Sequence, residues 1–344
     1  MNGASAYTNM FREAAQAPEV VHEQLQANAP RIARLAERLR AHPPRAVVTC
    51  ARGSSDHAAT FARYLIETRL GLLTSSAAPS VSSVYDARPD LAGSLMLAIS
   101  QSGASPDLLA TVSSARAAGA YVLALVNAES SPLAQLADEV LPLRAGAERS
   151  VAATKSYIAS LSAIVQLVSA WARDAQLIAA QQQSPQLLAR AWELDWSVAA
   201  ARLVHANDLY VIGRGLGLAV AQEAALKFKE TCALHAEAIS AAELRHGPMA
   251  LVRPGFPLLV FSQDDESRAG VVALAGELAG AGADVLLAGG SARGATVLPA
   301  LETHPVIEPL LFTQSFYRLA NALSLARGGD PDHPPHLHKV TETV

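Results

Sequence analysis

Short apolar runs alternate with helical stretches along the first half of the chain. The runs at 46–50, 95–99 and 121–126 are rich in aliphatic residues, as buried strands are. Segments with helical spacing follow the first two, at 55–70 and 105–118. Strands that alternate with helices in this way form a parallel sheet with helices on both faces. The pattern therefore predicts an α/β fold.

The same alternation starts again in the second half. Two long helices are expected first, at about 152–174 and 184–205, with the polar stretch 181–185 between them. The renewed alternation predicts strands at 209–212, 257–261 and 284–288 and helices at 216–232, 265–281 and 312–327. A helix over 13–41 precedes the first strand, and the Pro- and His-rich tail is expected to be irregular.

Three short matches connect the two halves. Each pair of matching segments is 162 or 163 residues apart and occupies the same place in the strand–helix alternation. The pairs are Ala51-Arg52-Gly53 with Gly213-Arg214-Gly215, Ser100-Gln101 with Ser262-Gln263, and 119–122 with 282–285. We therefore expect two tandem α/β domains, at 1–190 with the N-terminal helix and at 191–344 with the C-terminal tail.

Composition narrows the class of protein. A length of 344 residues fits two domains of roughly 150 residues each. The hydrophobic fraction of 51% excludes intrinsic disorder, and a net charge of −4 without a basic block argues against a nucleic-acid partner. With no signal peptide or membrane-length apolar run, we expect a cytoplasmic protein without a membrane partner. Cys50 and Cys232 lack metal-ligand spacing and are not expected to form a disulfide.

The loops after the first two strands are rich in hydroxyl groups. Ser54 and Ser55 follow Gly53, and the next loop reads Ser100-Gln101-Ser102-Gly103-Ala104-Ser105. Hydroxyls and free backbone amides at helix starts suit a phosphate group, and ligands of parallel sheets bind at this edge. The alternative is that these residues only cap helices. The matching loop of the second half carries three carboxylates, at 264–266, so only the first copy is expected to bind phosphate.

Titratable groups gather between residues 223 and 248. Lys227 and Glu230 share a helix face, as do Glu243 and His246, and such groups near a cavity perform acid–base chemistry. Spacing alone leaves open a surface ion pair for the first two and a helix-terminal histidine for His246. In the tail, the three histidines and Lys339 fit a solvated segment better than a metal site, so no metal is expected.

Several separated motifs resemble those of the sugar isomerase (SIS) domain family. SQSG after a strand, ERSVAATK, ALKFKE, HAEA, ELRHGP and the Lys-Val-Thr-Glu near the end occur in the family's order. They are most similar to the isomerase half of glucosamine-6-phosphate synthase, over nearly the whole chain. The resemblance implies two tandem flavodoxin-like αβα sandwich domains with parallel sheets and a phosphorylated sugar as ligand. It implies no cofactor.

The resemblance also implies roles for individual residues. Glu230 corresponds to the base that moves a proton between C1 and C2, and His246 to a ring-opening histidine contributed by the neighbouring subunit of a homodimer. Lys227 corresponds to a lysine near the sugar hydroxyls, and Lys339 to a tail lysine that can form a Schiff base. The residues that correspond to sugar- and phosphate-binding positions are Ser54, Ser55, Ser100, Gln101, Ser102, Ser105, Glu148 and Val151.

Two departures from the synthase refine the expected activity. Residue 2 is Asn, where the synthase has the cysteine of its glutaminase domain, so we expect no built-in ammonia source. The loop 100–107 reads SQSGASPD, which resembles the stand-alone amino-sugar deaminases and isomerases of the family. The last motif is also altered, with Val340 directly after Lys339.

We therefore expect an enzyme that converts glucosamine 6-phosphate and water to fructose 6-phosphate and ammonia. Within the same fold, the alternatives are a fructosamine 6-phosphate deglycase, a galactosamine-6-phosphate deaminase and a simple aldose–ketose isomerase. An alternative from another class is a sugar-phosphate-sensing module. Sensors of this family usually carry a DNA-binding domain and one SIS domain, which this pattern does not match.

Overall fold

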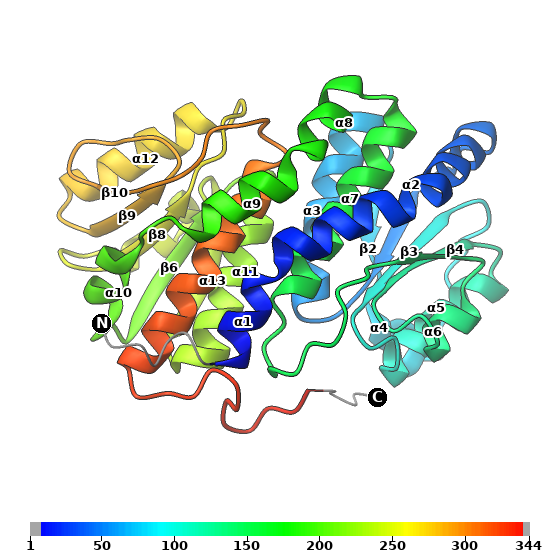
Figure 1. The fold of residues 1–344 in the computed structure, drawn as a ribbon, viewed down its shortest axis with the longest axis horizontal. Coiled ribbons are helices and arrows are strands. Elements are labelled where there is room, and N and C mark those ends of the chain that lie inside the picture. Colours follow the sequence, from blue (N-terminus) through cyan, green and yellow to red (C-terminus); the bar gives the residue numbers. More distant parts are fainter. Residues whose placement is uncertain (1–7, 340–344) are drawn as a thin grey trace. The chain divides into compact units, whose positions relative to one another are not determined.

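The structure is a computed structural model that describes residues 8–339 and contains two compact units (Figure 1). Unit 1 comprises the chain up to Pro18, Arg149–Thr154 and Gln183–Leu337, and unit 2 comprises Glu19–Glu148, Lys155–Gln182 and the chain from His338. Each unit contains one five-stranded sheet, so the predicted α/β fold with two parallel sheets is confirmed. The domain boundary expected near residue 190 stays a prediction.

The sheet of unit 2 is parallel throughout and has the strand order β2-β1-β3-β4-β5. Its central strands are almost completely buried, which is why they appear in the sequence as continuous apolar runs. The strands are β1 (Val47–Cys50), β2 (Thr74–Ser76), β3 (Leu95–Ser100), β4 (Tyr121–Val126) and β5 (Glu139–Pro142).

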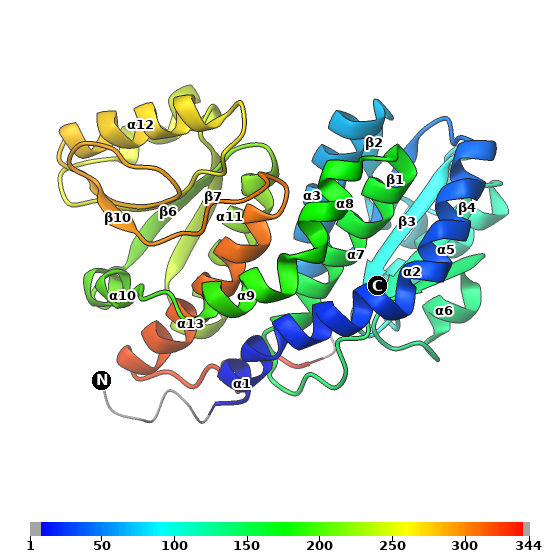
Figure 2. The same ribbon diagram turned by 45° about the horizontal axis from the view of Figure 1, so that its top comes forward.

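Helices cover both faces of this sheet. Figure 2 shows α5 (Pro106–Ala117) and α6 (Pro132–Leu136) on one face and α3 (Ser54–Leu70) and α7 (Lys155–Ala172) on the other. Met96 and Ala98 of β3 pack toward α5, while the alternate residues of the same strand face the opposite way. The remaining helices of the unit are α2 (Ala17–Ala41), α4 (Pro79–Ser83) and α8 (Ala175–Gln182).

The sheet of unit 1 has the same topology as that of unit 2. Its order is β10-β9-β8-β6-β7, which is the order 2-1-3-4-5 of the first sheet read from the other end. This shared order is the flavodoxin-like one and confirms the two-copy prediction. The strands are β6 (Asp208–Gly213), β7 (His235–Ser240), β8 (Pro257–Phe261), β9 (Asp284–Ala288) and β10 (Thr296–Leu298).

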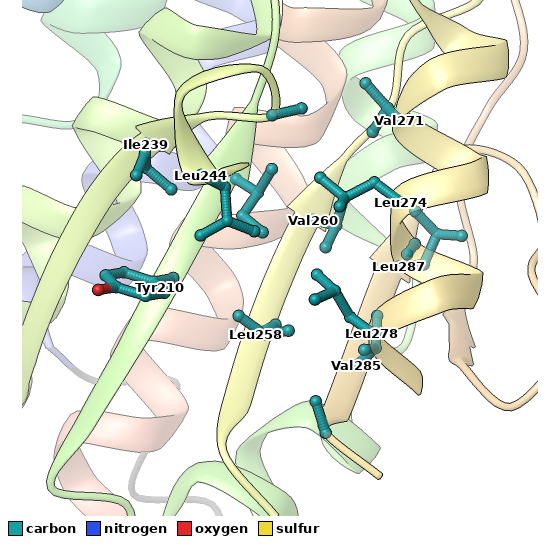
Figure 3. Close-up of a cluster of buried hydrophobic side chains, with 14 of the residues drawn as sticks. Tyr210, Ile239, Leu244, Leu258, Val260, Val271, Leu274, Leu278, Val285 and Leu287 are labelled. Carbon is teal, nitrogen blue, oxygen red and sulfur yellow. The ribbon is translucent and has the colours of Figure 1, made fainter. Parts of the chain in front are cut away.

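Two helix layers also enclose the sheet of unit 1. Leu258 and Val260 of β8 point toward Leu274 and Leu278 of α12 (Arg268–Gly280), as Figure 3 shows. On the other face, the ring of Phe261 lies 5.8 Å from that of Phe312 on α13 (Glu308–Ala326). The unit also contains α1 (Asn9–Ala15), α9 (Ser184–Trp192), α10 (Ser197–Leu203), α11 (Leu216–Cys232) and the 3₁₀ helices η2 (Glu243–His246) and η3 (Pro248–Leu251).

The long helices expected from the pattern are broken more often than predicted. The helix expected over 13–41 begins at Asn9 and breaks at Gln16, because Pro18 has no N–H to donate to the carbonyl oxygen of Ala14. The Gln314 side chain donates to that oxygen instead, at 3.0 Å.

A second break divides the helix expected over 184–205. It lies between Trp192 and Ser197, where the Asp195 carboxylate accepts the N–H of Ser197, the first residue of α10, at 2.8 Å. The polar stretch expected to separate two helices is also partly helical. Gln181 lies on α8, buried, and donates to the carbonyl oxygen of Ser162 at 2.8 Å.

Helix α7 is the most apolar helix of the chain. Nearly all of its residues are buried, including Tyr157, which is among the largest fully buried side chains. Within residues 8–339, however, neither α7 nor any other helix combines the length and apolarity needed to cross a membrane.

The buried cysteines provide a test of the packing. Burial raises the pKa of the Cys50 thiol to about 12 and that of Cys232 to about 11. Because the thiolate is the reactive form, we expect neither to react with Ellman's reagent at about pH 8 in the folded protein. Protein unfolded in urea should release two equivalents of thionitrobenzoate per chain. Fast labelling of either thiol in the native protein would contradict this packing.

Candidate active site

The two serine-rich loops of unit 2 lie side by side. They follow β1 and β3, which are paired in parallel, so both loops lie at the carboxyl edge of the sheet. Ser54 and Ser55 open α3, and Ser105 is the N-cap residue of α5. Ser100 is buried, while the other predicted phosphate ligands are partly accessible: Ser54, Ser55, Gln101, Ser102 and Ser105.

An ion pair between the loops fixes their spacing. The Arg52 guanidinium donates to one oxygen of Asp107 through Nε at 2.9 Å and through a terminal nitrogen at 2.7 Å. Asp107 is buried, whereas Arg52 is half exposed. The sequence interpretation missed Arg52 as a site residue. The available signal was the single guanidinium in an otherwise neutral loop.

Backbone geometry gives these loops their shape. Gly53 has φ +55° and ψ −133°, and its counterpart Gly215 has φ +57° and ψ −127° before α11, a conformation that essentially only glycine adopts. Gly103 is required for space as well, because an added Cβ would lie 2.3 Å from the Ser131 hydroxyl oxygen. The Ser100 hydroxyl accepts the Gly103 N–H at 2.9 Å, so this serine also braces the loop.

In the second copy, a side chain fills the corresponding loop. Gln263 is buried and donates to the Arg214 carbonyl oxygen at 2.8 Å and to Asp265 at 2.7 Å. The side-chain oxygen of Gln263 lies so close to Gly217 that a Cβ added to this glycine would be 2.4 Å from it. Together with the nearby carboxylates, this side chain makes the second loop a poor anion site. Phosphate binding by the first copy stays a prediction.

Glu148 and Lys339 meet within unit 2. The Lys339 ammonium lies 3.5 Å from the Glu148 carboxylate, which is buried and also accepts the Ser156 hydroxyl at 2.6 Å. Val151 belongs to unit 1, where its N–H donates to the Asp332 carbonyl oxygen at 3.4 Å. The altered motif after Lys339, at Val340 and Thr341, lies outside the described residues.

A buried network of charges lies on α11. Lys227 is fully buried and donates to Glu230 at 2.5 Å, and its ammonium lies 3.3 Å from Glu223. The buried Tyr317 hydroxyl on α13 donates to Glu223 at 2.9 Å. The pair of Lys227 and Glu230 is therefore not a surface ion pair. The sequence interpretation missed Glu223 and Tyr317, although Glu223 stands four residues before Lys227, on the same helix face.

The charges of this network stabilise one another. Burial alone would lower the pKa of Lys227, but the carboxylates of Glu223 and Glu230 outweigh it and raise the pKa above its ordinary value. Lys227 therefore stays an ammonium ion. Glu230 remains 20% exposed and lines a groove of about 1190 Å³ with Lys229, His205 and Arg327. A carboxylate that is fixed on one side and open on the other can accept and return a proton.

His246 lies on a separate short helix, whereas the tail residue His333 lines the same groove as Glu230. His246 and Glu243 are exposed at the two ends of the 3₁₀ helix η2. The two residues therefore lie on a single short turn and not on one face of an α-helix. His333 contacts Asp330 at 2.9 Å in the irregular tail. In the described part of the chain, no cluster of three or more His, Cys, Asp and Glu residues could hold a metal ion.

The buried ammonium group predicts a specific loss of stability. We expect Lys227→Ala to lower the free energy of unfolding by about 3–5 kcal/mol, because Glu223 would stay buried without a counter-charge. Lys229→Ala, at an exposed position of the same helix, is the matched control and should change it by less than about 0.5 kcal/mol. Urea unfolding followed by circular dichroism measures both. Equal effects of the two substitutions would contradict a buried charge pair.

Comparison with known proteins finds curated relatives that are named isomerizing aminotransferases. Over 309 residues the chain is 36% identical to the glutamine–fructose-6-phosphate aminotransferase (isomerizing) of Aeropyrum pernix, covering 84% of this chain and 49% of that protein. The corresponding enzyme of Symbiobacterium thermophilum is 34% identical over 316 residues, covering 86% and 51%. The chain thus spans about half the length of the curated relatives it matches.

Solved structures share the fold along nearly the whole chain. A protein from Silicibacter pomeroyi DSS-3 whose name, phosphosugar isomerase, is provisional has a TM-score of 0.91 and 44% identity, covering 94% of this chain and 100% of that one. The C-terminal domain of glucosamine-fructose-6-phosphate aminotransferase from Francisella tularensis has a TM-score of 0.86 and 25% identity, covering 97% and 100%. The Thermotoga maritima glucosamine-6-phosphate deaminase shares the fold at a TM-score of 0.78 and 22% identity, covering 98% and 100%.

A family model agrees with both sets of relatives and with the repeated sheet order. The model of the SIS domain matches residues 42–170 and again residues 202–291, once for each sheet. The resemblance seen in the motifs is therefore confirmed, and the chain belongs to the SIS domain family.

Proposed function

We propose that this chain is an enzyme that transfers a proton between C1 and C2 of a phosphorylated amino sugar and releases ammonia. The observation that carries the proposal is the partly exposed Glu230 carboxylate, held by the fully buried Lys227. The names of the curated relatives support it, since they combine isomerisation, fructose 6-phosphate and transfer of an amino group.

The substrate phosphate is proposed to bind at the serine-rich loops of unit 2. Their hydroxyls and the starts of α3 and α5 supply neutral donors, and the pair of Arg52 and Asp107 keeps the two loops together. Binding a group far from C1 and C2 supplies energy for orienting the reacting carbons. Glu148 and Val151 are proposed to contact the sugar, and the Lys339 ammonium to approach it from the tail.

The proposed reaction balances without an added reactant other than water. His246 assists ring opening of glucosamine 6-phosphate, which gives an aldehyde at C1. Glu230 removes the proton from C2, and the electrons move toward the C1 oxygen, which takes a proton from solvent to give an enolamine. Glu230 then returns its proton to C1, and the nitrogen loses one proton to solvent. The product carries an imine at C2, and addition of water to this imine releases ammonia and fructose 6-phosphate. These steps require no cofactor, and Lys227 keeps the Glu230 carboxylate in place.

A homodimer in the cytoplasm is part of the proposal. His246 is exposed, and Leu251 of the neighbouring helix η3 is 56% exposed, which is unusual for a large aliphatic side chain in a compact unit. A second copy that covers this segment would bury Leu251 and could bring His246 to the site of its neighbour. Sedimentation at micromolar concentration would distinguish a dimer from a monomer.

Isomerisation without loss of ammonia is the second candidate, because the relatives are named isomerizing enzymes. The same Glu230 chemistry on a neutral sugar gives a ketose in place of an imine. Galactosamine 6-phosphate and fructosamine 6-phosphate are alternative amino substrates. A sensor would need the phosphate loops but not the buried charges around Glu230, so the network favours an enzyme.

Ammonia release tests the proposal directly. Purified protein given glucosamine 6-phosphate without glutamine should produce ammonia and fructose 6-phosphate in equal amounts, measured by two coupled assays. Glu230→Gln should abolish turnover while calorimetry still detects sugar-phosphate binding, because the amide cannot accept the proton. Glu23→Gln, at an exposed position of α2, is the control and should keep wild-type turnover. Ketose formation without ammonia would favour the isomerase, and binding without either product would favour a sensor.

The phosphate loops predict a separate effect on affinity. Ser102→Ala should raise the KM for the phosphorylated sugar by roughly 10-fold, because a lost hydrogen bond to a charged group costs on the order of 1.5 kcal/mol. The kcat should change little, since Ser102 does not touch the reacting carbons in this proposal. Ser114→Ala, on α5 away from its start, is the control. An unchanged KM for Ser102→Ala would remove this residue from the phosphate site.

A further inference from the structure

Helix α1 contains a buried carboxylate that the proposed chemistry does not use. Glu13 is only 7% exposed, although the helix has seven residues and its neighbour Arg12 is exposed. The Glu13 carboxylate accepts hydrogen bonds from the N–H and hydroxyl groups of Ser150 and from the N–H of Arg149. The Ser150 N–H lies at 3.1 Å, and the other two donors are closer. All three residues belong to unit 1.

These hydrogen bonds are the means by which the buried charge is stabilised. Among residues 8–339, Glu13 forms no ion pair with a lysine, arginine or histidine. A buried carboxylate without a cation is costly unless several donors point at it. The required donors come from Arg149 and Ser150, 136 and 137 residues away in the sequence. The stability of the buried charge therefore depends on one conformation of this loop.

The tail is attached to the same helix. The Asp332 carboxylate accepts the N–H groups of Asn9 at 2.7 Å and Met10 at 2.8 Å, and its carbonyl oxygen accepts the Val151 N–H at 3.4 Å. Helix α1, the loop 149–151 and Asp332 thus form a closed set of contacts. We call the set of Glu13, Arg149, Ser150, Val151 and Asp332 the α1–loop–tail clamp.

The clamp is covalently continuous with two groups of the proposed site. Glu148 directly precedes Arg149, and Lys339 follows Asp332 by seven residues. Glu148 and Lys339 lie 3.5 Å apart. On the far side of the loop, Asn127 provides a second anchor, since its side chain accepts the Ala145 N–H and donates to the Gly146 carbonyl oxygen, both at 2.8 Å. Asn127 therefore fixes the segment before Glu148 within unit 2, and the clamp fixes the segment after it within unit 1.

We propose that Glu13 is a positioning residue of the active site. It holds the backbone of Arg149 and Ser150, and with Asp332 it fixes Val151, a proposed sugar contact, and the course of the tail within unit 1. The inference rests on the proposed function for its catalytic consequence, but the constraint on the loop is independent of it. Glu13 itself contacts no substrate in this proposal, and it acts through the loop.

The experiment compares Glu13→Gln with Glu13→Asp. In Glu13→Gln, one acceptor oxygen becomes an NH₂ group that faces the donors of the loop, so the clamp should open. In Glu13→Asp, the charge is kept on a shorter side chain, so partial recovery is expected. Glu19→Gln, at an exposed position of α2, is the matched control. Each variant is assayed well below its own unfolding midpoint, and rates are expressed per folded molecule.

Hydrogen–deuterium exchange gives the readout that does not depend on turnover. Glu13→Gln should speed exchange in the peptides that cover 149–151 and 328–339, while exchange in α7 and in the sheets stays unchanged. In steady-state kinetics, kcat/KM should fall on the order of 10- to 100-fold, because displacing a substrate-positioning group by about 1 Å can cost up to about 100-fold. Glu13→Asp should lie between Glu13→Gln and the wild type.

The outcomes separate the two proposals. Faster exchange with unchanged kcat and KM would overturn the positioning role, as would activity losses that unfolding explains completely. Unchanged exchange in both peptides would overturn the clamp. A wild-type protein that shows no turnover on any amino-sugar phosphate would contradict the proposed function, while the exchange data would still decide whether Glu13 orders the loop. In that case, calorimetric binding of fructose 6-phosphate replaces kinetics as the functional readout.

Discussion

The buried ammonium group of Lys227 is the constraint on which the chemistry of unit 1 depends. An unpaired charge in a protein interior is costly, so Lys227 needs both Glu223 and Glu230 within reach. Glu223 is held in turn by Tyr317 on α13, which packs against α11. One requirement of electrostatics thus connects two helices and leaves a single carboxylate, that of Glu230, partly open to solvent. The site proposed here follows from that arrangement.

The two copies of the α/β domain show how one topology can take on different tasks. Both sheets have the same order, and the glycines before α3 and α11 have the same conformation. In unit 2 the loop that follows β3 keeps accessible hydroxyl groups. In unit 1 the buried side chain of Gln263 occupies the equivalent space, and α11 carries the ionisable residues instead. The repeat therefore supplies one candidate phosphate cradle and one candidate base, each on its own sheet.

Besides the buried ion pairs, hydrogen bonds between segments distant in the sequence hold the loops of the proposed site. Glu13 holds Arg149 and Ser150, and Asp332 holds the start of α1. Both carboxylates accept hydrogen bonds from backbone N–H groups. Backbone donors have fixed directions, so such contacts define the path of a loop more closely than a flexible lysine would. Loops that carry function need this support because they have little core of their own.

The local sequence pattern alone predicted the limits of the elements that are buried on both sides or bounded by glycine. The strands 121–126, 257–261 and 284–288 and the helix 216–232 have the limits that the sequence predicts, because continuous burial leaves an unbroken apolar signal. The internal repeat predicted the fold, and the motifs identified the family. The edge strand β7 escaped prediction because its partly exposed residues leave no continuous apolar run. The breaks in the long helices also escaped prediction, since they depend on Pro18 and on the side chain of Asp195. Only the tertiary structure decided that Lys227 is buried, that Arg52 reaches Asp107 and that Glu13 reaches Ser150, because these partners and environments are set by packing between segments that the sequence keeps far apart.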